Sequence, residues 1–447
     1  MRSRWKIRAE FLLRESDGRG MTEDKQASDR TQEKRLTVSL CMIARDEEEW
    51  LPRCLESVYG HVDEIILVDT GSEDRTIPIA HGFGARVHRH PWEQDFSRHR
   101  NQSLSYASGD WILILDADEE LFSEDAARIR NVVGETSRDY LFLQGYDLDR
   151  NGAVRGVFNQ IRLFRNRMGI HYEGRIHNQL RVAGHGDVTR LRFRHHGYDM
   201  PREKMEEKHR RTTSLLREKI LEEPDNALCR MQLSTSYSLH GDYEKAIEEG
   251  MQAIRLLHAR GDHDPHFATA FFNVAHGHFM LGRPDKAEEM SLAGLRHFDK
   301  DLNAYHFLAA LHLRKQEWKK CIEAALKYLE VRSLFEDEPE YMAGIYFSSF
   351  GKQHEVAFAL ASALFMERDY EGAETFFRRA FEEEGRLPER AMRISRFYLA
   401  HSMMENALLW FETAYKLGCR DVAFLKELAQ HLRDQGNPKQ AMSSPSV

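Results

Sequence analysis

Acidic residues are concentrated at the end of one apolar segment of the sequence. Residues 111–120 read WILILDADEE, in which five apolar positions run into Asp116, Asp118, Glu119 and Glu120. The apolar run is typical of a strand buried on both faces. Residues two apart on an extended chain point the same way, so we expect Asp116 and Asp118 to face one site. Paired carboxylates suit Mg²⁺ or Mn²⁺, and such a cation would offset their mutual repulsion.

The same acids have a simpler interpretation as a solvated strand end, with Glu119 and Glu120 favouring the first turn of a helix. Two other D-x-D triplets, at residues 147–149 and 262–264, follow no such strand. Position in the fold distinguishes residues 116–118, because ligands of open α/β sheets bind outside the carboxyl ends of the strands. A cation held there would also act as a Lewis acid on a phosphate leaving group.

Other segments supply polar groups for a nucleotide. Asp69 ends the run EIILVD and either accepts hydrogen bonds from a base or ribose or holds the turn beside Gly71. Ala44 and Glu47 follow the preceding apolar run and lie near Asp69 if the two strands are neighbours. Arg100 lies just before the acidic strand, and the planar fork of arginine suits phosphate, although surface arginines are commoner.

Two patterns of different period predict the elements that position these residues. Residues 36–198 alternate aliphatic runs with amphipathic stretches, which indicates a mostly parallel sheet covered by helices. After residue 198 a repeat of about 34 residues begins, which is typical of stacked helical hairpins, with a generic helical bundle as the alternative. The expected units start near residues 227, 268, 302, 354, 388 and 422.

Small residues recur at one position of this repeat. Ala373, Ala407 and Ala441 each occupy position 20 of a unit, where a small side chain lets two antiparallel helices pack closely. The third unit departs from the pattern, with Gln316 at the usual glycine and Cys321 at the usual alanine. An insertion containing LFEDEPEYMAGIYF follows that unit and interrupts the register.

The composition narrows the class of protein. The 447 residues suffice for two or three domains, and a net charge of −8 with a pI near 6.3 argues against a nucleic-acid binder. No apolar run reaches the roughly 18 to 20 residues that cross a bilayer, so we expect no transmembrane segment. The five cysteines never form a CxxC pair, which suits the cytoplasm. We predict a charged, mobile leader over residues 1–34, with Met21 as an alternative start.

Three segments together resemble the GT-A domain of family 2 glycosyltransferases: VSLCMIARDEEEWLPRCLESV, DEIILVDTGSEDRT and RNQSLSYASGDWILILDADEE. The resemblance is close over residues 38–121, and within the family it is closest to the lipopolysaccharide core β-glucosyltransferase type and to bacterial transferases with C-terminal repeats. Residues 227–447 resemble the tetratricopeptide repeat (TPR). The expected fold class is an α/β GT-A (Rossmann-like) domain at residues 35–200, a linker helix at 201–226 and an all-α TPR superhelix at 227–447.

The resemblance implies an inverting transfer of a sugar from a nucleoside diphosphate sugar, with Mn²⁺ or Mg²⁺ as cofactor. Asp69 would contact the base, Arg100 the nucleotide and Asp116 the ribose or the metal. Asp118 would be the principal metal ligand, and Ala44 and Glu47 would complete the nucleotide-sugar site. The repeats imply a surface for a protein, peptide or glycan acceptor, or for a homodimer.

The distal part of the site is predicted from GIHYEGRIHNQL, at residues 169–180. Glu173 is the candidate general base, since a carboxylate is the usual choice, and a solvated loop acid is the alternative. His177 would complete the metal or diphosphate site. Thr70 and Asn178 stand where relatives often have an acid. These departures leave open a second function, a TPR scaffold whose transferase domain is inactive. A nucleotidyltransferase is a weaker alternative, because such an enzyme would usually have a basic, glycine-rich phosphate loop near the N-terminus, whereas residues 44–49 are acidic.

Overall fold

The parallel strands predicted from the aliphatic runs are present. In the computed structural model, which describes residues 35–149, 152–175, 178–196, 202–338, 345–383 and 385–434, they lie side by side in the order β3-β2-β1-β4. They comprise β1 (Val38–Ala44), β2 (Glu64–Asp69), β3 (Arg86–Arg89) and β4 (Trp111–Ile114). The leader predicted at residues 1–34, with Met21, lies outside the described residues, as do His177 and Ala441.

Helices connect these strands, as the alternating pattern indicates. The connecting helices are α2 (Leu51–Val58), α3 (Thr76–Gly82) and α4 (Phe96–Ser105). Helix α2 buries Leu51, Cys54, Leu55 and Val58, which share one face at helical spacing, against the sheet core. Helix α4 begins at an Asp95 side chain that accepts a hydrogen bond from the Arg98 N–H, which satisfies one of the free donors of the first turn.

The sheet is mixed rather than mostly parallel beyond β4. Strand β7 (Val154–Arg165) runs antiparallel to β4 and to β6 (Tyr140–Leu148), β6 is parallel to β10 (Gly186–His195), and β10 is antiparallel to β5 (Glu119–Leu121). Residues 149–153, which join β6 to β7, are too few for the crossover that a parallel pair needs. Short helices α5 (Ser123–Ala126) and α6 (Ile129–Glu135) follow β5, and β8 (His171–Glu173) pairs with β9 (Gln179–Arg181) in a separate hairpin.

The second half consists of helices packed in antiparallel pairs. After α7 (Arg202–Glu222) the paired helices are α8 (Ala227–His240) with α9 (Tyr243–Arg260), α10 (Ala268–Met280) with α11 (Pro284–His297), α12 (Leu302–Lys315) with α13 (Trp318–Asp337), α14 (Gln353–Met366) with α15 (Tyr370–Glu382), and α16 (Pro388–Ala400) with α17 (Met404–Lys416). A short 3₁₀ turn, η1 (Pro265–Phe267), precedes α10, and α18 (Val422–Asp434) follows the last pair. The expected unit starts coincide with the starts of α8, α10, α12, α16 and α18, and differ by one residue at α14.

The small residues of the repeat lie between the paired helices. Ala373 and Ala407 are fully buried, and Cys321 takes the same place in the third pair. Gln316 adopts a φ of 59°, the left-handed conformation that Gly241 and Gly282 adopt easily in the first two units and that Arg368 and Ser402 adopt in the next two. The two departures in the third unit therefore preserve its hairpin. No helix among the residues described here is both long and apolar enough to cross a membrane.

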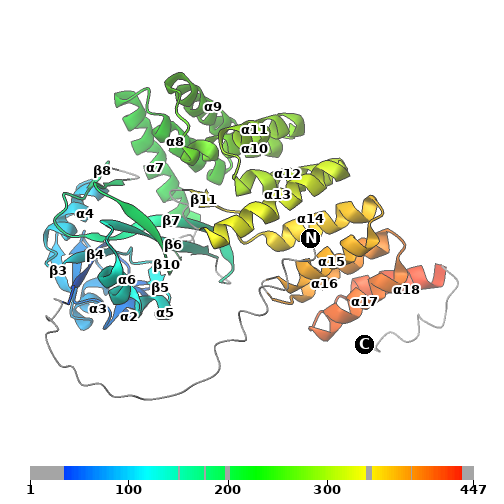
Figure 1. Cartoon of the computed structure of the whole chain (residues 1–447), viewed down its shortest axis with the longest axis horizontal. Helices are drawn as coiled ribbons and strands as arrows, with labels where there is room; N and C mark the ends of the chain where they lie inside the picture. The colour runs from blue at the N-terminus through cyan, green and yellow to red at the C-terminus, as the bar shows by residue number, and fades with distance from the viewer. Residues whose placement is uncertain are drawn as a thin grey trace, which may run out of the picture. The chain divides into compact units, whose positions relative to one another are not determined.

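The insertion after the third unit joins the two halves. Its residues 346–347 form β11 (Tyr346–Phe347), which pairs antiparallel with β7 of the sheet. Val157 of β7 shares a buried apolar cluster with α12, α13 and the segment around β11. Figure 1 shows β11 beside β7, between the sheet and the helical half. The repeat half thus contributes a strand to the sheet of the first half.

Candidate active site

The carboxyl ends of β1, β2 and β4 meet at one edge of the sheet. Ala44 is paired with Asp69 in the β1–β2 register, and Cys41 with Ile114 in the β1–β4 register. The N–H of Thr70 donates to the carbonyl of Ala44 at 3.0 Å. The expected proximity of Ala44 to Asp69 is therefore confirmed by the strand register.

Asp69 holds the turn that follows β2. Its side chain is 2% exposed and accepts hydrogen bonds from the N–H of Gly71 at 3.1 Å and of Ser72 at 3.2 Å. Gly71 adopts a φ of 113°, which glycine reaches without strain. The N–H of Glu47 donates to Thr76 Oγ1 at 2.7 Å, so the loop after β1 is fastened to the start of α3. Of the two roles that the sequence allows for Asp69, the structure shows the one in which its side chain holds the turn.

Two arginines offset the repulsion among the acids that follow β4. Arg100 Nη2 donates to Asp116 Oδ1 at 2.6 Å, and the buried Arg162 forms an ion pair with the buried Glu119. Arg162 Nη2 also lies 3.6 Å from Asp116 Oδ2. Burial alone would raise the pKa of Asp116, but the charges of Arg100 and Arg162 outweigh it and lower the pKa to about 2. Asp116 is therefore an anion held between two guanidinium groups.

Asp118 faces a histidine instead of an arginine. Its side chain is 22% exposed, and its Oδ2 lies 3.4 Å from His195 Nε2 at the end of β10. The other ring nitrogen of His195, Nδ1, lies 2.7 Å from Asp147 Oδ1. Burial alone would lower the pKa of His195, but hydrogen bonds to Asp118 and Asp147 outweigh it and raise the pKa to about 10. His195 is therefore a cation between two carboxylates at neutral pH.

The sequence alone did not predict three members of this cluster, Arg162, Asp147 and His195. Arg162 and Asp147 carry no local signal, because they reach the acids only through the pairing of β4, β6 and β7. His195 and His196 are adjacent on the chain, and adjacent side chains on a strand point to opposite faces. His195 contacts Asp118, whereas His196 lies 3.3 Å from Glu120.

The β8–β9 hairpin, which carries Glu173, is attached to α4. The side chain of Asn101 donates to the carbonyl of Tyr172 at 2.8 Å and accepts from its N–H at 2.7 Å. Glu173 is half-exposed and accepts from Arg181 Nε at 2.8 Å, and its other oxygen lies 3.1 Å from His171 Nε2. These hydrogen bonds, that of Arg181 first, lower the pKa of Glu173. The hairpin thus stands beside the helix of Arg100, with its acid already paired.

The donor groups at the D-x-D fit a hard divalent cation with few protein ligands. The side chains of Asp116 and Asp118 are 31% and 22% exposed, and each has a partner, Arg100 for Asp116 and His195 for Asp118. Where the structure describes the chain, three ligating atoms lie within 4.8 Å of one another at His209, His240 and Asp242 and again at Glu288, His312 and Glu317, but not at the D-x-D. Mg²⁺ and Mn²⁺ commonly take their remaining ligands from water and substrate phosphates. Asp118 has the longer contact with its partner, 3.4 Å against 2.6 Å for Asp116, and is the carboxylate that we expect to hold such an ion.

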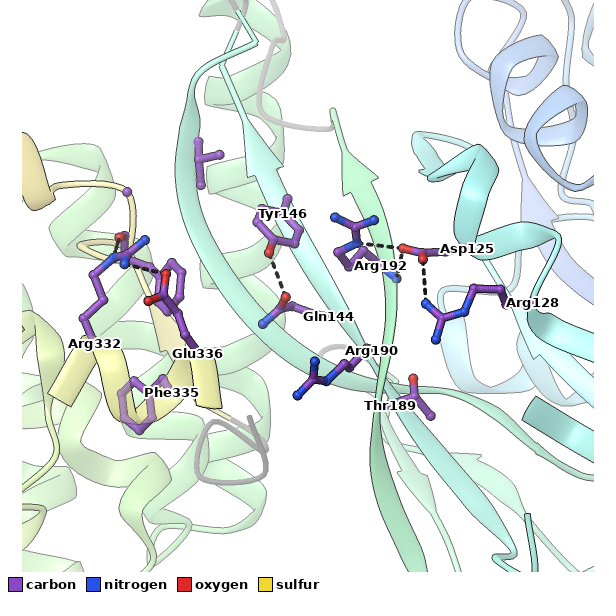
Figure 2. A pocket seen from close by; sticks show the side chains of 13 residues that line it. Asp125, Arg128, Gln144, Tyr146, Thr189, Arg190, Arg192, Arg332, Phe335 and Glu336 are labelled. Atoms are coloured by element: carbon purple, nitrogen blue, oxygen red, sulfur yellow. Dashed lines mark hydrogen bonds and ion pairs between the residues drawn. The ribbon is translucent and has the colours of Figure 1, made fainter. Parts of the chain in front are cut away.

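A separate cavity of about 430 Å³ lies where the sheet meets α13. Figure 2 shows Arg332 and Glu336 of the helix facing Tyr146, Arg190 and Arg192 of the strands. Gln144 and Tyr146 of β6 line it, and residue 147 points to the opposite face of the strand.

The charges of this cavity are largely paired within its walls. Arg128 and Arg192 contact Asp125 at 3.4 and 2.7 Å, and Arg332 contacts Glu336 at 2.6 Å. The walls nevertheless carry four arginines against two carboxylates, and Arg190 is the arginine outside these pairs. The cavity therefore has an excess of positive charge and is distinct from the acid cluster.

Comparison with known proteins shows which family the first half is similar to. Residues 39–194 match the model of glycosyl transferase family 2. A TPR repeat-containing protein of Synechococcus elongatus is 46% identical over 141 residues, which cover 31% of this chain and 34% of that protein. The SPbeta prophage-derived glycosyltransferase SunS of Bacillus subtilis is 27% identical over 198 residues, or 42% of this chain and 46% of SunS. An uncharacterized glycosyltransferase of Rickettsia felis is 36% identical over 108 residues, or 24% of this chain and 38% of that protein.

The chain thus spans between about a third and a half of the length of these curated relatives. Among solved structures, YrrB is described as a TPR protein with an unusual peptide-binding site. It is 15% identical to this chain with a TM-score of 0.38, and the match covers 50% of this chain and 99% of YrrB. MamA is 17% identical with a TM-score of 0.32, and covers 41% of this chain and 92% of MamA. These two likenesses are too distant to support an argument about function.

Proposed function

We propose that the protein transfers a sugar from a nucleoside diphosphate sugar to an acceptor. The premise is that residues 39–194 form a family 2 glycosyltransferase domain, which tetratricopeptide-like repeats follow. The observation that carries the proposal is the pair of aspartates at the carboxyl end of β4, with Arg100 2.6 Å from Asp116 and the side chain of Asp118 22% exposed. A transfer with inversion at the sugar follows from the resemblance to the family.

Each residue of the site has a proposed role. Asp118 would hold Mn²⁺ or Mg²⁺, which when bound neutralises charge on the diphosphate leaving group. Arg100 keeps Asp116 ionised and directed toward the same edge, so Asp116 can accept from a ribose hydroxyl or join the cation. Asp69, which pairs with Ala44 in the β1–β2 register, and Glu47 in the loop after β1 would contact the base and the sugar nucleotide.

Glu173 is our candidate for the general base that removes the acceptor proton. Its support is the attachment of β8 to α4 by two hydrogen bonds between the side chain of Asn101 and the backbone of Tyr172, which bring the hairpin to the helix of Arg100. Arg181 would have to release the carboxylate, because a base that is paired and has a lowered pKa accepts a proton poorly. His177, the proposed further ligand, lies outside the described residues.

The acceptor is proposed to be a protein or peptide, or a glycan, brought to the site by the repeat half. A lipopolysaccharide core is the alternative acceptor, which the sequence resemblance suggests. The repeat half would recruit that acceptor or form a homodimer, and it is joined to the transferase sheet through β11. A cytoplasmic location belongs to this proposal, because nucleoside diphosphate sugars and free thiols are both suited to that compartment.

A second candidate function is a scaffold whose transferase domain binds a sugar nucleotide without turnover. Two observations favour it: Asn178 stands where relatives often have an acid, and Glu173 is paired with Arg181. Binding of a donor with no release of the nucleoside diphosphate would identify this function.

Titration calorimetry tests the proposal directly. UDP-glucose and GDP-mannose, followed by a wider set of nucleoside diphosphate sugars, are titrated into the full chain with and without Mn²⁺. We expect metal-dependent binding of one donor in the wild type that disappears in Asp118→Ala. Asp225→Ala, which removes an exposed aspartate of the repeat half, is the matched control and should bind like the wild type. A folded wild type that binds none of the donors would overturn the proposal.

A further inference from the structure

A chain of hydrogen bonds leads from the repeat half to the D-x-D motif. Tyr346 Oη donates to Asp147 Oδ2 at 2.8 Å, and Asp147 Oδ1 lies 2.7 Å from His195 Nδ1. His195 Nε2 in turn lies 3.4 Å from Asp118 Oδ2. Asp147 is 2% exposed, so its two oxygens depend on the protein for hydrogen bonds. Tyr346 and Asp118 are thus connected through two intervening side chains.

The register of the sheet aligns this chain. Asp147 of β6 lies opposite Gly156 of β7 on one side and His195 of β10 on the other. Side chains of residues directly opposite one another in a sheet point to the same face. Residues 156, 147 and 195 therefore form one row across the sheet, and His195 at its end faces Asp118.

Gly156 makes room for the tyrosine. A Cβ atom at residue 156 would lie 2.4 Å from Tyr346 Oη and 2.5 Å from the ring carbon that bears it, which is closer than real Cβ atoms approach. The ring of Tyr346 therefore crosses the sheet at the position where β7 has no side chain, and its hydroxyl reaches Asp147. An alanine at residue 156 would displace the hydroxyl while leaving Tyr346 in the chain.

The backbone of Tyr346 is fixed by the repeat half. Asn303 Nδ2 of α12 donates to the carbonyl of Tyr346 at 3.0 Å. The neighbouring Phe347 is fully buried, and its ring centroid lies 4.9 Å from that of Phe335 on α13. A shift of α12 or α13 would therefore move β11 and, with it, the hydroxyl that Asp147 accepts.

We propose that Tyr346 is a positioning residue for the transferase site: through Asp147 it fixes the ring of His195 and so the placement of Asp118, coupling the repeat half to cation binding. This inference rests on the proposed function for the role of Asp118. Groups that hold a metal-site side chain in place typically change metal affinity or activity by about 10- to 100-fold when removed. Occupation of the repeat half by a partner would act on the site along the same route.

The test compares two variants that each remove one tyrosine hydroxyl from a carboxylate. Tyr346→Phe removes the donor to Asp147, and Tyr398→Phe removes a donor to Glu374 at 2.7 Å within the repeat half. Mn²⁺ binding to the full chain is measured by titration with electron paramagnetic resonance detection. We expect Tyr346→Phe to weaken Mn²⁺ binding about 10-fold or more and Tyr398→Phe to leave it unchanged. Gly156→Ala should reproduce the effect of Tyr346→Phe.

Kinetics separate positioning from general loss of structure. If a donor is turned over, Tyr346→Phe should need more Mn²⁺ for half-maximal rate while keeping kcat at saturating Mn²⁺. A thermal melt of each variant checks that folding is preserved. Mn²⁺ affinity in a folded Tyr346→Phe equal to that of the wild type would overturn the proposal.

A metal-independent readout distinguishes this inference from the proposed function. The ¹⁵N resonances of His195, assigned with His195→Gln, report the hydrogen bonds of both ring nitrogens. They should shift in Tyr346→Phe and not in Tyr398→Phe. A wild type that binds neither Mn²⁺ nor any donor would refute the transferase proposal, and unchanged His195 resonances in Tyr346→Phe would refute the positioning of the ring.

Discussion

The buried pair of Arg162 and Glu119 allows a quantitative test of how the acid cluster is held. The two side chains are 4% and 2% exposed. Replacing Arg162 by methionine leaves Glu119 buried without its arginine, and replacing Glu119 leaves Arg162 with the more distant carboxylate of Asp116, 3.6 Å away. Breaking a buried ion pair in this way costs about 3–5 kcal/mol of folding stability. We expect Arg162→Met and Glu119→Met each to lose stability in that range.

The double variant should lose much less than the sum of the two. With both residues changed to methionine Asp116 keeps Arg100 at 2.6 Å, and the chief losses are its contact with Arg162 at 3.6 Å and the bond from its N–H to Glu119 Oε2 at 2.9 Å. A buried N–H left without a partner costs about 1–3 kcal/mol. The expected coupling between the two positions is therefore about 3 kcal/mol or more, from the difference between the summed single losses and the double loss.

Urea denaturation of the full chain, followed by the fluorescence of buried tryptophans such as Trp111 beside β7, measures these losses. Arg396→Met is the matched control, because the guanidinium of Arg396 is 58% exposed in its ion pair with Asp421. Exposed pairs of this kind contribute about 0–1 kcal/mol, so the control should change little. A loss of stability in the double variant equal to the sum of the two single losses would refute the reasoning.

Two further predictions concern the repeat half. Asp301 begins α12 and accepts from the N–H groups of Asn303 and Ala304, and burial raises its pKa to about 6. Because the pKa of Asp301 is higher in the folded than in the unfolded chain, its contribution to stability is complete below about pH 3.8 and is lost as the pH rises through 6. Asp301→Asn, which keeps the helix cap, should therefore be more stable than the wild type by up to about 3 kcal/mol at pH 7 and equally stable at pH 4. Urea denaturation at both pH values measures the difference. Gln316→Gly should raise the melting temperature, because glycine relieves about 1 kcal/mol of strain at a φ of 59°. An unchanged or lower melting temperature would contradict this second prediction.

The sequence by itself determined the elements whose signals are local. The apolar run before Asp116 predicted β4, because a strand buried on both faces needs an uninterrupted apolar composition. The 34-residue period predicted the starts of α16 at residue 388 and α18 at residue 422, because each hairpin repeats the same pattern of large and small side chains. The family resemblance, confirmed over residues 39–194, also rests on short continuous segments.

Only the tertiary structure decided which side chains surround the acids. Arg162, Asp147 and His195 reach the D-x-D through the pairing of β4, β7, β6 and β10, and strand pairing is set by contacts far apart in the chain. The sequence showed the segment after α13 as an interruption of the repeat, whereas it forms β11 on β7, with Tyr346 199 residues from its partner Asp147. Neither segment carries a signal of the other, because a strand of two residues is too short to show a pattern of its own and is placed by its pairing with β7.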